Sequence, residues 1–324
     1  MSPVKMAAKN EFRILGRREG NEEPIRFTYR GVEFHPDCFH VVAGLNAVDT
    51  REYTERTFRA LKEAGQVCAR MGAYKPRTSP YSFQGYGKQC LPYVFELAGK
   101  HGIRVISMEV TRDEHLDEIR AALRATGEAT GVMLQIGTRN TQNFELLKAV
   151  GSQRDFPILI KRGFGITLHE SLLAAEYVAA AGNRDIVFCL RGMKTHLGDP
   201  HRNLVDFAHI PVVKRLTRMP VCIDPSHSVG LRGADPDGLS DIFHAAAQGI
   251  VSGANLVLTD IHPEPRKALV DGAQALSLEE LPAFLEDCAI AREAYLKRRS
   301  RLTAGQRQET QMNADEPQMN AEKA

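Results

Sequence analysis

Short, continuous apolar runs alternate with longer segments of helical period between about residues 39 and 298. This alternation is typical of repeated strand–helix units around a parallel sheet, because strands covered on both faces are apolar throughout. Eight runs have the length of a strand: residues 39–45, 66–70, 104–110, 131–136, 157–161, 186–190, 221–224 and 255–260. The segments 53–64, 168–181 and 239–252 have the length and spacing of amphipathic helices.

Eight such units over roughly 250 residues predict an α/β fold, a closed (β/α)₈ or TIM barrel. A doubly wound open sheet has similar local patterning, but the number of units favours the barrel. Ahead of it, residues 26–34 alternate around Arg30-Gly31, which predicts a short β-hairpin that could plug the barrel's N-terminal end. We expect an N-terminal extension with this hairpin (residues 1–35), a catalytic barrel (36–298) and a disordered tail (299–324) too polar to repay its ordering entropy by burial.

Composition changes this picture little. The chain has 324 residues, 43% hydrophobic and 25% charged, which is enough to bury a large core. No apolar run approaches the roughly 18–20 residues of a membrane span, and the first residues lack the apolar stretch of a secretory signal, so we expect a cytoplasmic protein. A formal charge of +2 without a basic stripe argues against nucleic-acid binding. The six cysteines have no Cys-x-x-Cys spacing, so neither a zinc box nor a disulfide framework is predicted.

The C-terminal ends of the predicted strands are strongly cationic, and in a (β/α)₈ barrel this is the end where the chemistry lies. Thr78 adds a hydroxyl to a set of six cations: Arg70, Lys75, Arg77, Arg139, Lys161 and Arg191. Such a group would repel itself unless an anionic ligand compensates it. A phosphate monoester carries about −1.5 to −2 charges, so the expected ligands hold two phosphates, or a phosphate and a carboxylate.

Acid/base candidates stand at the same strand ends. They are Glu109, His227, Asp260 and Asp271, while the amide Asn46 follows the first strand run. One histidine with two carboxylates (His227, Asp260 and Asp271) suits a divalent ion such as Mg²⁺, Mn²⁺ or Fe²⁺. The alternative is that these are polar groups of the barrel mouth that satisfy one another.

Several long motifs resemble the 3-deoxy-D-arabino-heptulosonate 7-phosphate (DAHP) synthases, particularly the shorter Iβ type. Residues 74–85 read Tyr-Lys-Pro-Arg-Thr-Ser-Pro-Tyr-Ser-Phe-Gln-Gly, identical throughout to the loop of that family. Further matching motifs lie within residues 135–143, 161–163, 189–192, 224–228 and 262–272. The similarity covers about residues 26–296 and also implies the (β/α)₈ fold.

The resemblance implies an aldol-type condensation of phosphoenolpyruvate with an aldose phosphate, in a C–C bond-forming transferase (EC 2.5.1 type) of the shikimate pathway. The products would be a 3-deoxy-2-ketoaldonate phosphate and inorganic phosphate. Erythrose 4-phosphate is favoured as acceptor by the motif 75–78. The phosphoenolpyruvate ligands would be Arg70, Lys75, Arg139, Lys161 and Arg191, and the aldose phosphate would face Lys75, Arg77 and Thr78. Catalytic roles would fall to Lys75, His227, Asn46, Asp260, Asp271 and Glu109. A homo-oligomer is expected.

Two departures from the family pattern concern its metal. The metal-binding cysteine of an Ala-Gly-Pro-Cys motif is Asn46 here, and the glutamate expected before Val-His-Pro is Asp260. Two expectations therefore stay open: no metal at all, or a divalent cation such as Mn²⁺ or Mg²⁺ held by His227, Asp260 and Asp271. A metal-free branch of the sister 3-deoxy-D-manno-octulosonate 8-phosphate (KDO8P) synthases has asparagine at this position. The departures also fit a homologue with a different acceptor in specialised metabolism, or a non-catalytic paralogue that binds phosphorylated metabolites.

Overall fold

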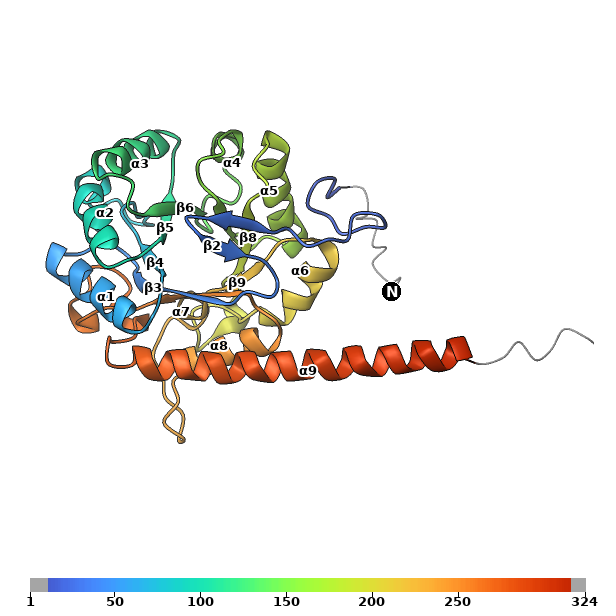
Figure 1. Ribbon diagram of the computed structural model, residues 1–324. Helices are drawn as coiled ribbons and strands as arrows, with labels where there is room; N and C mark the ends of the chain where they lie inside the picture. The colour runs from blue at the N-terminus through green and yellow to red at the C-terminus, as the bar shows by residue number, and fades with distance from the viewer. Residues whose placement is uncertain (1–10, 316–324) are drawn as a thin grey trace, which may run out of the picture.

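Eight parallel strands form a closed barrel in the computed structural model, which describes residues 11–315 (Figure 1). The last strand pairs with the first through five Cα partners, from Leu256 opposite His40 to Asp260 opposite Gly44. The strands are β3 (His40–Leu45), β4 (Cys68–Met71), β5 (Val105–Val110), β6 (Gly131–Ile136), β7 (Ile158–Lys161), β8 (Ile186–Leu190), β9 (Val221–Ile223) and β10 (Leu256–Asp260). Each coincides with one predicted apolar run, so the TIM-barrel prediction is confirmed.

Helices cover the outside of the barrel. They are α1 (Arg51–Glu63), α2 (Leu91–Lys100), α3 (Glu114–Ala125), α4 (Phe144–Ser152), α5 (Leu168–Ala181), α6 (Ile210–Leu216), α8 (Asp241–Val251) and α9 (Leu281–Asp315). The short helix α7 (Pro225–Val229) is instead fully buried at the C-terminal end of β9. Local sequence fixes where several of them begin. Thr50 accepts a hydrogen bond from the Tyr53 amide at the start of α1, and Thr167 forms a capping box with Glu170 at the start of α5.

The predicted hairpin precedes the barrel as β1 (Phe27–Tyr29) and β2 (Val32–Phe34). Its two-residue turn, Arg30-Gly31, has positive φ angles of 50° and 72°, the conformation that matches strand twist in a tight hairpin. Apolar side chains of both strands join a cluster with inward-facing residues of the barrel: Val42, Cys68, Val105, Met133, Leu159, Val187, Cys189, Cys222, Leu256 and Leu258. The hairpin therefore closes the N-terminal end of the barrel and leaves the opposite end for chemistry.

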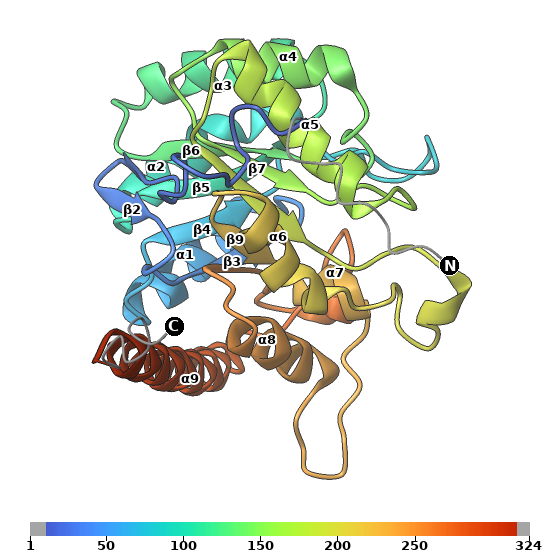
Figure 2. The same ribbon diagram turned by 90° about the vertical axis from the view of Figure 1, so that its right-hand side faces the viewer.

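Helix α9 runs along α8 and then continues well beyond the barrel (Figures 1 and 2). Phe284 and Cys288 on its first turns are buried. The helix extends to Asp315, so residues 299–315 are helical where the sequence predicts a disordered tail, because helix-forming Leu, Ala, Arg, Gln and Glu predominate there. The remaining tail residues, 316–324, lie outside the described residues. In the described part of the chain, no helix has both the length and the apolarity to cross a membrane.

Candidate active site

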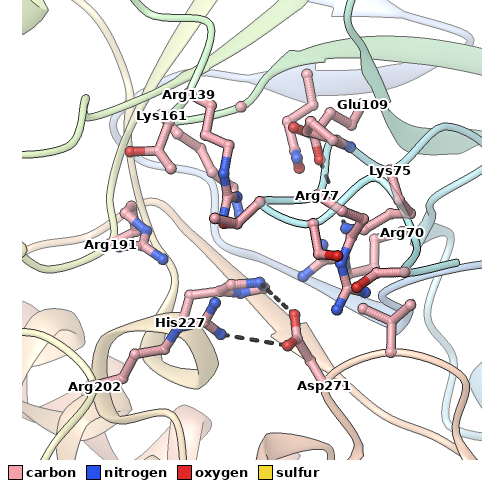
Figure 3. A pocket seen from close by; sticks show the side chains of 18 residues that line it. Arg70, Lys75, Arg77, Glu109, Arg139, Lys161, Arg191, Arg202, His227 and Asp271 are labelled. Atoms are coloured by element: carbon pink, nitrogen blue, oxygen red, sulfur yellow. Dashed lines mark hydrogen bonds and ion pairs between the residues drawn. The ribbon is translucent and has the colours of Figure 1, made fainter. Parts of the chain in front are cut away.

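A polar cavity of about 250 Å³ opens at the C-terminal ends of the strands (Figure 3). Ten of the residues predicted from the sequence line it: Arg70, Lys75, Arg77, Thr78, Glu109, Arg139, Lys161, Arg191, His227 and Asp271. The other two, Asn46 and Asp260, are buried directly behind Arg70 and reach the cavity only through their neighbours. Side chains from separate strands therefore converge on one space.

Three of the six predicted cations already have carboxylate partners inside the protein. Arg70 pairs with Asp260, and Lys161 pairs with Asp224. Lys75 Nζ lies 3.6 Å from Glu109 Oε2. The expectation that only a ligand compensates the six cations is therefore too strong, because half of them are balanced by buried carboxylates.

The amide of Asn46 links three charged side chains of the site. Its Oδ1 accepts hydrogen bonds from Arg70 Nη2 at 2.7 Å and from Lys75 Nζ at 2.8 Å, and its Nδ2 donates to Asp271 Oδ2 at 2.6 Å. A neutral side chain thus orients two cations and one anion at once. A thiolate at this position could accept hydrogen bonds from the cations but could not donate to Asp271.

Arg191 is the clearest anion-binding group of the cavity. The residue is 2% exposed, and its Nε and Nη1 atoms have no hydrogen-bond partner within residues 11–315. Burial lowers the pKa of this guanidinium, although nearby Asp224 opposes that effect. The centroid of the Phe164 ring lies 5.0 Å from Arg191 Cζ and 5.2 Å from Arg139 Cζ, so both cations contact the same aromatic ring. Buried donors without partners at the wall of a cavity are suited to an anionic ligand.

His227 stands between two carboxylates. His227 lies in the first turn of α7, which Asp224 caps. The Asp224 carboxylate accepts a hydrogen bond from the His227 backbone amide, and its two oxygens lie 3.0–3.1 Å from His227 Nδ1. Nε2 lies 3.7 Å from Asp271 Oδ2 (Figure 3). This places the ring where it can pass a proton between a buried carboxylate and the cavity.

Asp271 is held in an unusual position and charge state. Its φ of 53° lies in the left-handed region, a conformation that costs energy for a residue with a side chain and is often found at functional sites. Burial tends to raise the pKa of Asp271, but the hydrogen bond and charge of His227, with the charges of Arg202 and Lys75, outweigh burial and hold that pKa well below its usual range. Asp271 is therefore an anion at neutral pH.

Lys75 and Glu109 form a second acid/base pair on the opposite wall. Burial lowers the pKa of Lys75, and the charge of Glu109 partly opposes this shift. Space for the carboxylate exists because residue 137 is glycine: a Cβ atom there would lie 1.8 Å from Glu109 Oε1. A lysine with a lowered pKa is a better proton donor than an exposed one.

The residues that would replace the family's metal ligands do not fit a divalent ion. Both carboxylate oxygens of Asp260 accept hydrogen bonds, Oδ1 from Arg70 and Oδ2 from Gln274 Nε2 at 2.6 Å. The Asn46 oxygen is likewise engaged by two cations. A ligand set for Mg²⁺ or Mn²⁺ needs free oxygen lone pairs directed at one point, and here hydrogen-bond donors, most of them cationic, engage these oxygens. This arrangement fits the alternative in which the polar groups of the barrel mouth satisfy one another.

Two contributors to the cavity escape sequence reasoning. Arg202 lies on the long connection after β8, 3.5 Å from Asp271 Oδ1 and 3.0 Å from Gln274 Oε1. Phe164 follows β7 by three residues and supplies the aromatic face. Neither residue ends a predicted strand or belongs to a motif with characteristic spacing. The hydrophobic pattern of the sequence therefore gives no reason to place either of them at the site. Asp224, by contrast, begins the matched motif 224–228 and could have been added to the predicted site.

A closed parallel barrel with acid/base pairs and anion-binding cations at one end defines a (β/α)₈-barrel enzyme for small anionic metabolites. Comparison with known proteins agrees with this class of enzyme and identifies the family. The chain belongs to the DAHP synthetase I family, whose model matches residues 33–295.

Individual relatives support this assignment. The chain is 40% identical over 273 residues to a phospho-2-dehydro-3-deoxyheptonate aldolase of Thermotoga maritima, covering 84% of this chain and 75% of the relative. The crystal structure of a DAHP synthase of that organism superposes with a TM-score of 0.76 at 36% identity, covering 87% of this chain and 77% of the other. A 2-dehydro-3-deoxyphosphooctonate aldolase of Nitratidesulfovibrio vulgaris is 27% identical over 78% of this chain and 94% of its own.

Proposed function

We propose that the protein condenses phosphoenolpyruvate with erythrose 4-phosphate, giving a seven-carbon 3-deoxy-2-ketoaldonate phosphate and inorganic phosphate. The reaction class is C–C bond-forming transfer (EC 2.5.1 type). The observation that carries the proposal is the buried Arg191 guanidinium, which lines the cavity and whose Nε and Nη1 atoms lack hydrogen-bond partners in the described chain.

The charge of the cavity supports a highly anionic substrate. Seven cationic side chains line it, while four carboxylates lie on its wall or directly behind it: Glu109, Asp224, Asp260 and Asp271. The excess of three positive charges is close to the roughly −2.5 to −3 of a phosphate monoester joined to a carboxylate. Arg139, Lys161 and Arg191 would hold these anionic groups, with Arg70 and Lys75 completing the set.

The second substrate would bind against the loop 75–82. Lys75 and Arg77 lie beside Thr78, and Ser79 and Ser82 add hydroxyl groups to the same wall. Arg77 Nη1 has no hydrogen-bond partner within residues 11–315. This wall suits the phosphate and hydroxyl groups of a short aldose phosphate, with the aldehyde directed inward toward Lys75.

The residues present can supply each proton that the reaction moves. C3 of phosphoenolpyruvate attacks the aldehyde carbon, and the Lys75 ammonium donates a proton to the aldehyde oxygen as it becomes a hydroxyl. Water then adds to the cationic C2, and the His227–Asp271 pair accepts its proton. The resulting hemiketal then collapses: the C2–O bond to phosphate breaks as C2 becomes a ketone, and the departing phosphate takes up the hydroxyl proton. Fixed charges around C2 would stabilise the transition state without reorganisation.

Phosphate release tests the proposal. Purified protein with phosphoenolpyruvate and erythrose 4-phosphate is expected to form inorganic phosphate and product in equal amounts. Arabinose 5-phosphate replaces erythrose 4-phosphate in a parallel reaction, and faster turnover with the five-carbon sugar would overturn the acceptor assignment. Calorimetric binding of phosphoenolpyruvate without turnover of either sugar would indicate a different acceptor or a binding paralogue. No binding at millimolar phosphoenolpyruvate would contradict the whole proposal.

A further inference from the structure

Glu33, His35 and Cys38 come together at the closed end of the barrel, away from the candidate active site. Glu33 lies in β2, and the other two lie in the turn that leads into β3. One ligand atom of each, a carboxylate oxygen, a ring nitrogen and a sulfur, lies within 4.8 Å of the others. We propose that these three side chains form a zinc site with one coordination position open to solvent.

The three side chains converge on one point rather than forming a relay. His35 Nε2 lies 3.4 Å from Glu33 Oε2 and 2.8 Å from Cys38 Sγ. A thiol–imidazole–carboxylate relay needs a carboxylate hydrogen-bonded to the ring nitrogen opposite the thiol. Here Glu33 faces the same nitrogen as the thiol, and Asp37 Oδ2 lies 3.9 Å from the other nitrogen, beyond hydrogen-bond distance. Tetrahedral zinc with bonds of about 2.0–2.3 Å separates its ligand atoms by roughly 3.5 Å. The Glu33–His35 separation already matches, and the sulfur reaches its position by a small side-chain rotation.

The backbone that carries the ligands is fixed. The Cys38 amide donates to the His35 carbonyl at 3.1 Å, which closes a turn. The Arg292 guanidinium of α9 donates to the carbonyl groups of residues 36–38 at 3.1–3.4 Å, and Asn255 Nδ2 donates to the Pro36 carbonyl at 2.7 Å. Little conformational entropy is therefore lost when an ion binds.

The surroundings favour a cation. Two groups of Asp37 lie beside the second ring nitrogen of His35: its backbone amide donates to Nδ1 at 3.2 Å, and its carboxylate Oδ2 lies 3.9 Å from the same atom. An ion on Nε2 requires the proton on Nδ1, so binding would exchange the amide contact for the carboxylate, which is the usual partner of that proton at metal sites.

The donor set selects the class of metal. One oxygen, one nitrogen and one sulfur suit a borderline ion, and three protein ligands leave a fourth position for water. Solvent reaches this position because the Glu33 side chain is 67% exposed, while that of His35 is 17% exposed. The bound ion would tie the plug hairpin to the first barrel strand.

Cobalt is the direct probe, because its spectrum reports a thiolate ligand. Metal-stripped full-length protein titrated with Co²⁺ is expected to develop a thiolate-to-cobalt charge-transfer band that saturates at one equivalent and disappears on addition of Zn²⁺. Cys38→Ser removes the band, and Glu33→Gln, a change of an exposed side chain, weakens Co²⁺ binding by at least ~10- to 100-fold. Circular dichroism verifies that each variant is folded.

A matched control is available on the surface. His244 Nε2 contacts Asp235 Oδ2 at 2.5 Å in a histidine–carboxylate pair that is not part of any three-ligand group among the described residues. His244→Gln should leave the titration unchanged. No cysteine lines the active-site cavity, so ions bound there cannot produce the band. Absence of the band, or its survival in folded Cys38→Ser protein, would overturn the proposal.

Discussion

Arg191 shows how a single residue can carry a functional argument. Exposed arginines are common and say little, but this one combines 2% exposure with two nitrogens lacking hydrogen-bond partners in residues 11–315. A buried donor without a partner lowers the stability of the folded protein by about 1–3 kcal/mol, and by more when the group is charged. A bound anion would accept hydrogen bonds from the guanidinium and recover this free energy. The adjacent Leu190 is fully buried and contributes no opposing charge.

Replacing Arg191 by lysine should mainly weaken phosphoenolpyruvate binding. Lysine keeps the charge but loses the planar fork that can hold phosphate or carboxylate through two bonds. We expect the KM for phosphoenolpyruvate to rise about 10- to 100-fold, equivalent to ~1.5–3 kcal/mol, from one charged hydrogen bond. Steady-state kinetics measure this change. Arg232→Lys, at a surface pair with Glu280, is the control; an equal effect in both variants would contradict a specific role.

Chelation should leave catalysis unchanged. Asp260 and Asn46 are engaged by cationic donors, so the chemistry described above needs no ion at His227. Phosphate release is measured before and after extensive dialysis against EDTA, with the rate expected to agree within error. Loss of activity that added Mn²⁺ restores would refute this expectation.

The elements of this fold were predictable because each obeys a strong local rule. A parallel strand covered on both faces must be apolar throughout, so runs such as residues 131–136 coincide with β6. The turn Arg30-Gly31 is likewise recognisable from its glycine. Loops obey no such rule: Arg202 reaches the cavity along a connection whose path depends on tertiary contacts, including its hydrogen bond to Gln274. Helix α9 continues past Arg298 because local propensity, which burial arguments ignore, favours it.

Tyr74, directly before the loop 75–82, stacks on His115 of α3, and this contact should make the free energy of unfolding depend on pH. Tyr74 and His115 stack with ring centroids 3.6 Å apart, and the Tyr74 hydroxyl donates to Glu118. Burial, reinforced by the charge of Arg112, lowers the pKa of His115 to about 4. Because the folded state disfavours the protonated ring, this contribution is complete above the unfolded pKa near 6.5 and is lost as the pH falls through about 4.

We therefore expect the free energy of unfolding to drop by roughly 2 kcal/mol between pH 6.5 and 4 through this residue. Urea unfolding at several pH values measures the drop, and His115→Gln should flatten that part of the profile. His201→Gln, on a partly exposed side chain, serves as the comparison. An unchanged slope in the His115 variant would contradict the assignment.

The plug hairpin depends on its turn. Gly31 has a φ of 72°, and a Cβ atom there would also lie 3.2 Å from Arg104 Nη1. Gly31→Val should destabilise the protein by about 1–2 kcal/mol, because β-branched residues avoid the left-handed region. Gly31→Asn should cost less, since asparagine tolerates that region. Urea midpoints for the two variants give the comparison, and equal midpoints would exclude a conformational origin.

At the scale of the whole molecule, the candidate active site and the hairpin that closes the barrel lie at opposite ends of the barrel. The cavity lies where the strands end, and the hairpin packs where they begin. The part of α9 beyond the barrel (Figure 1) belongs to neither end. The homo-oligomer expected from the family resemblance stays a prediction, which light scattering of the full-length protein can test.

Removing residues 302–324 should leave catalysis intact. Among the α9 side chains whose burial the structure describes, residues 281–301, the buried apolar ones are Leu281, Phe284, Cys288 and Ala291. We expect kcat/KM for phosphoenolpyruvate and the thermal midpoint to match those of the full chain. A loss of activity accompanied by a smaller particle in light scattering would instead show that the segment sustains an assembly needed for turnover.

Glycine 137 has a consequence that reaches beyond its own position. With a Cβ only 1.8 Å from Glu109 Oε1, even alanine would evict the carboxylate, and Lys75 would then lose its nearest counter-charge. The ion pair of Lys75 thus depends on the absence of one carbon atom in the neighbouring loop. A side chain at residue 137 would be accommodated only by swinging the end of Glu109 away from the lysine, so a change in a residue that touches no substrate would alter the charge balance around the proton donor.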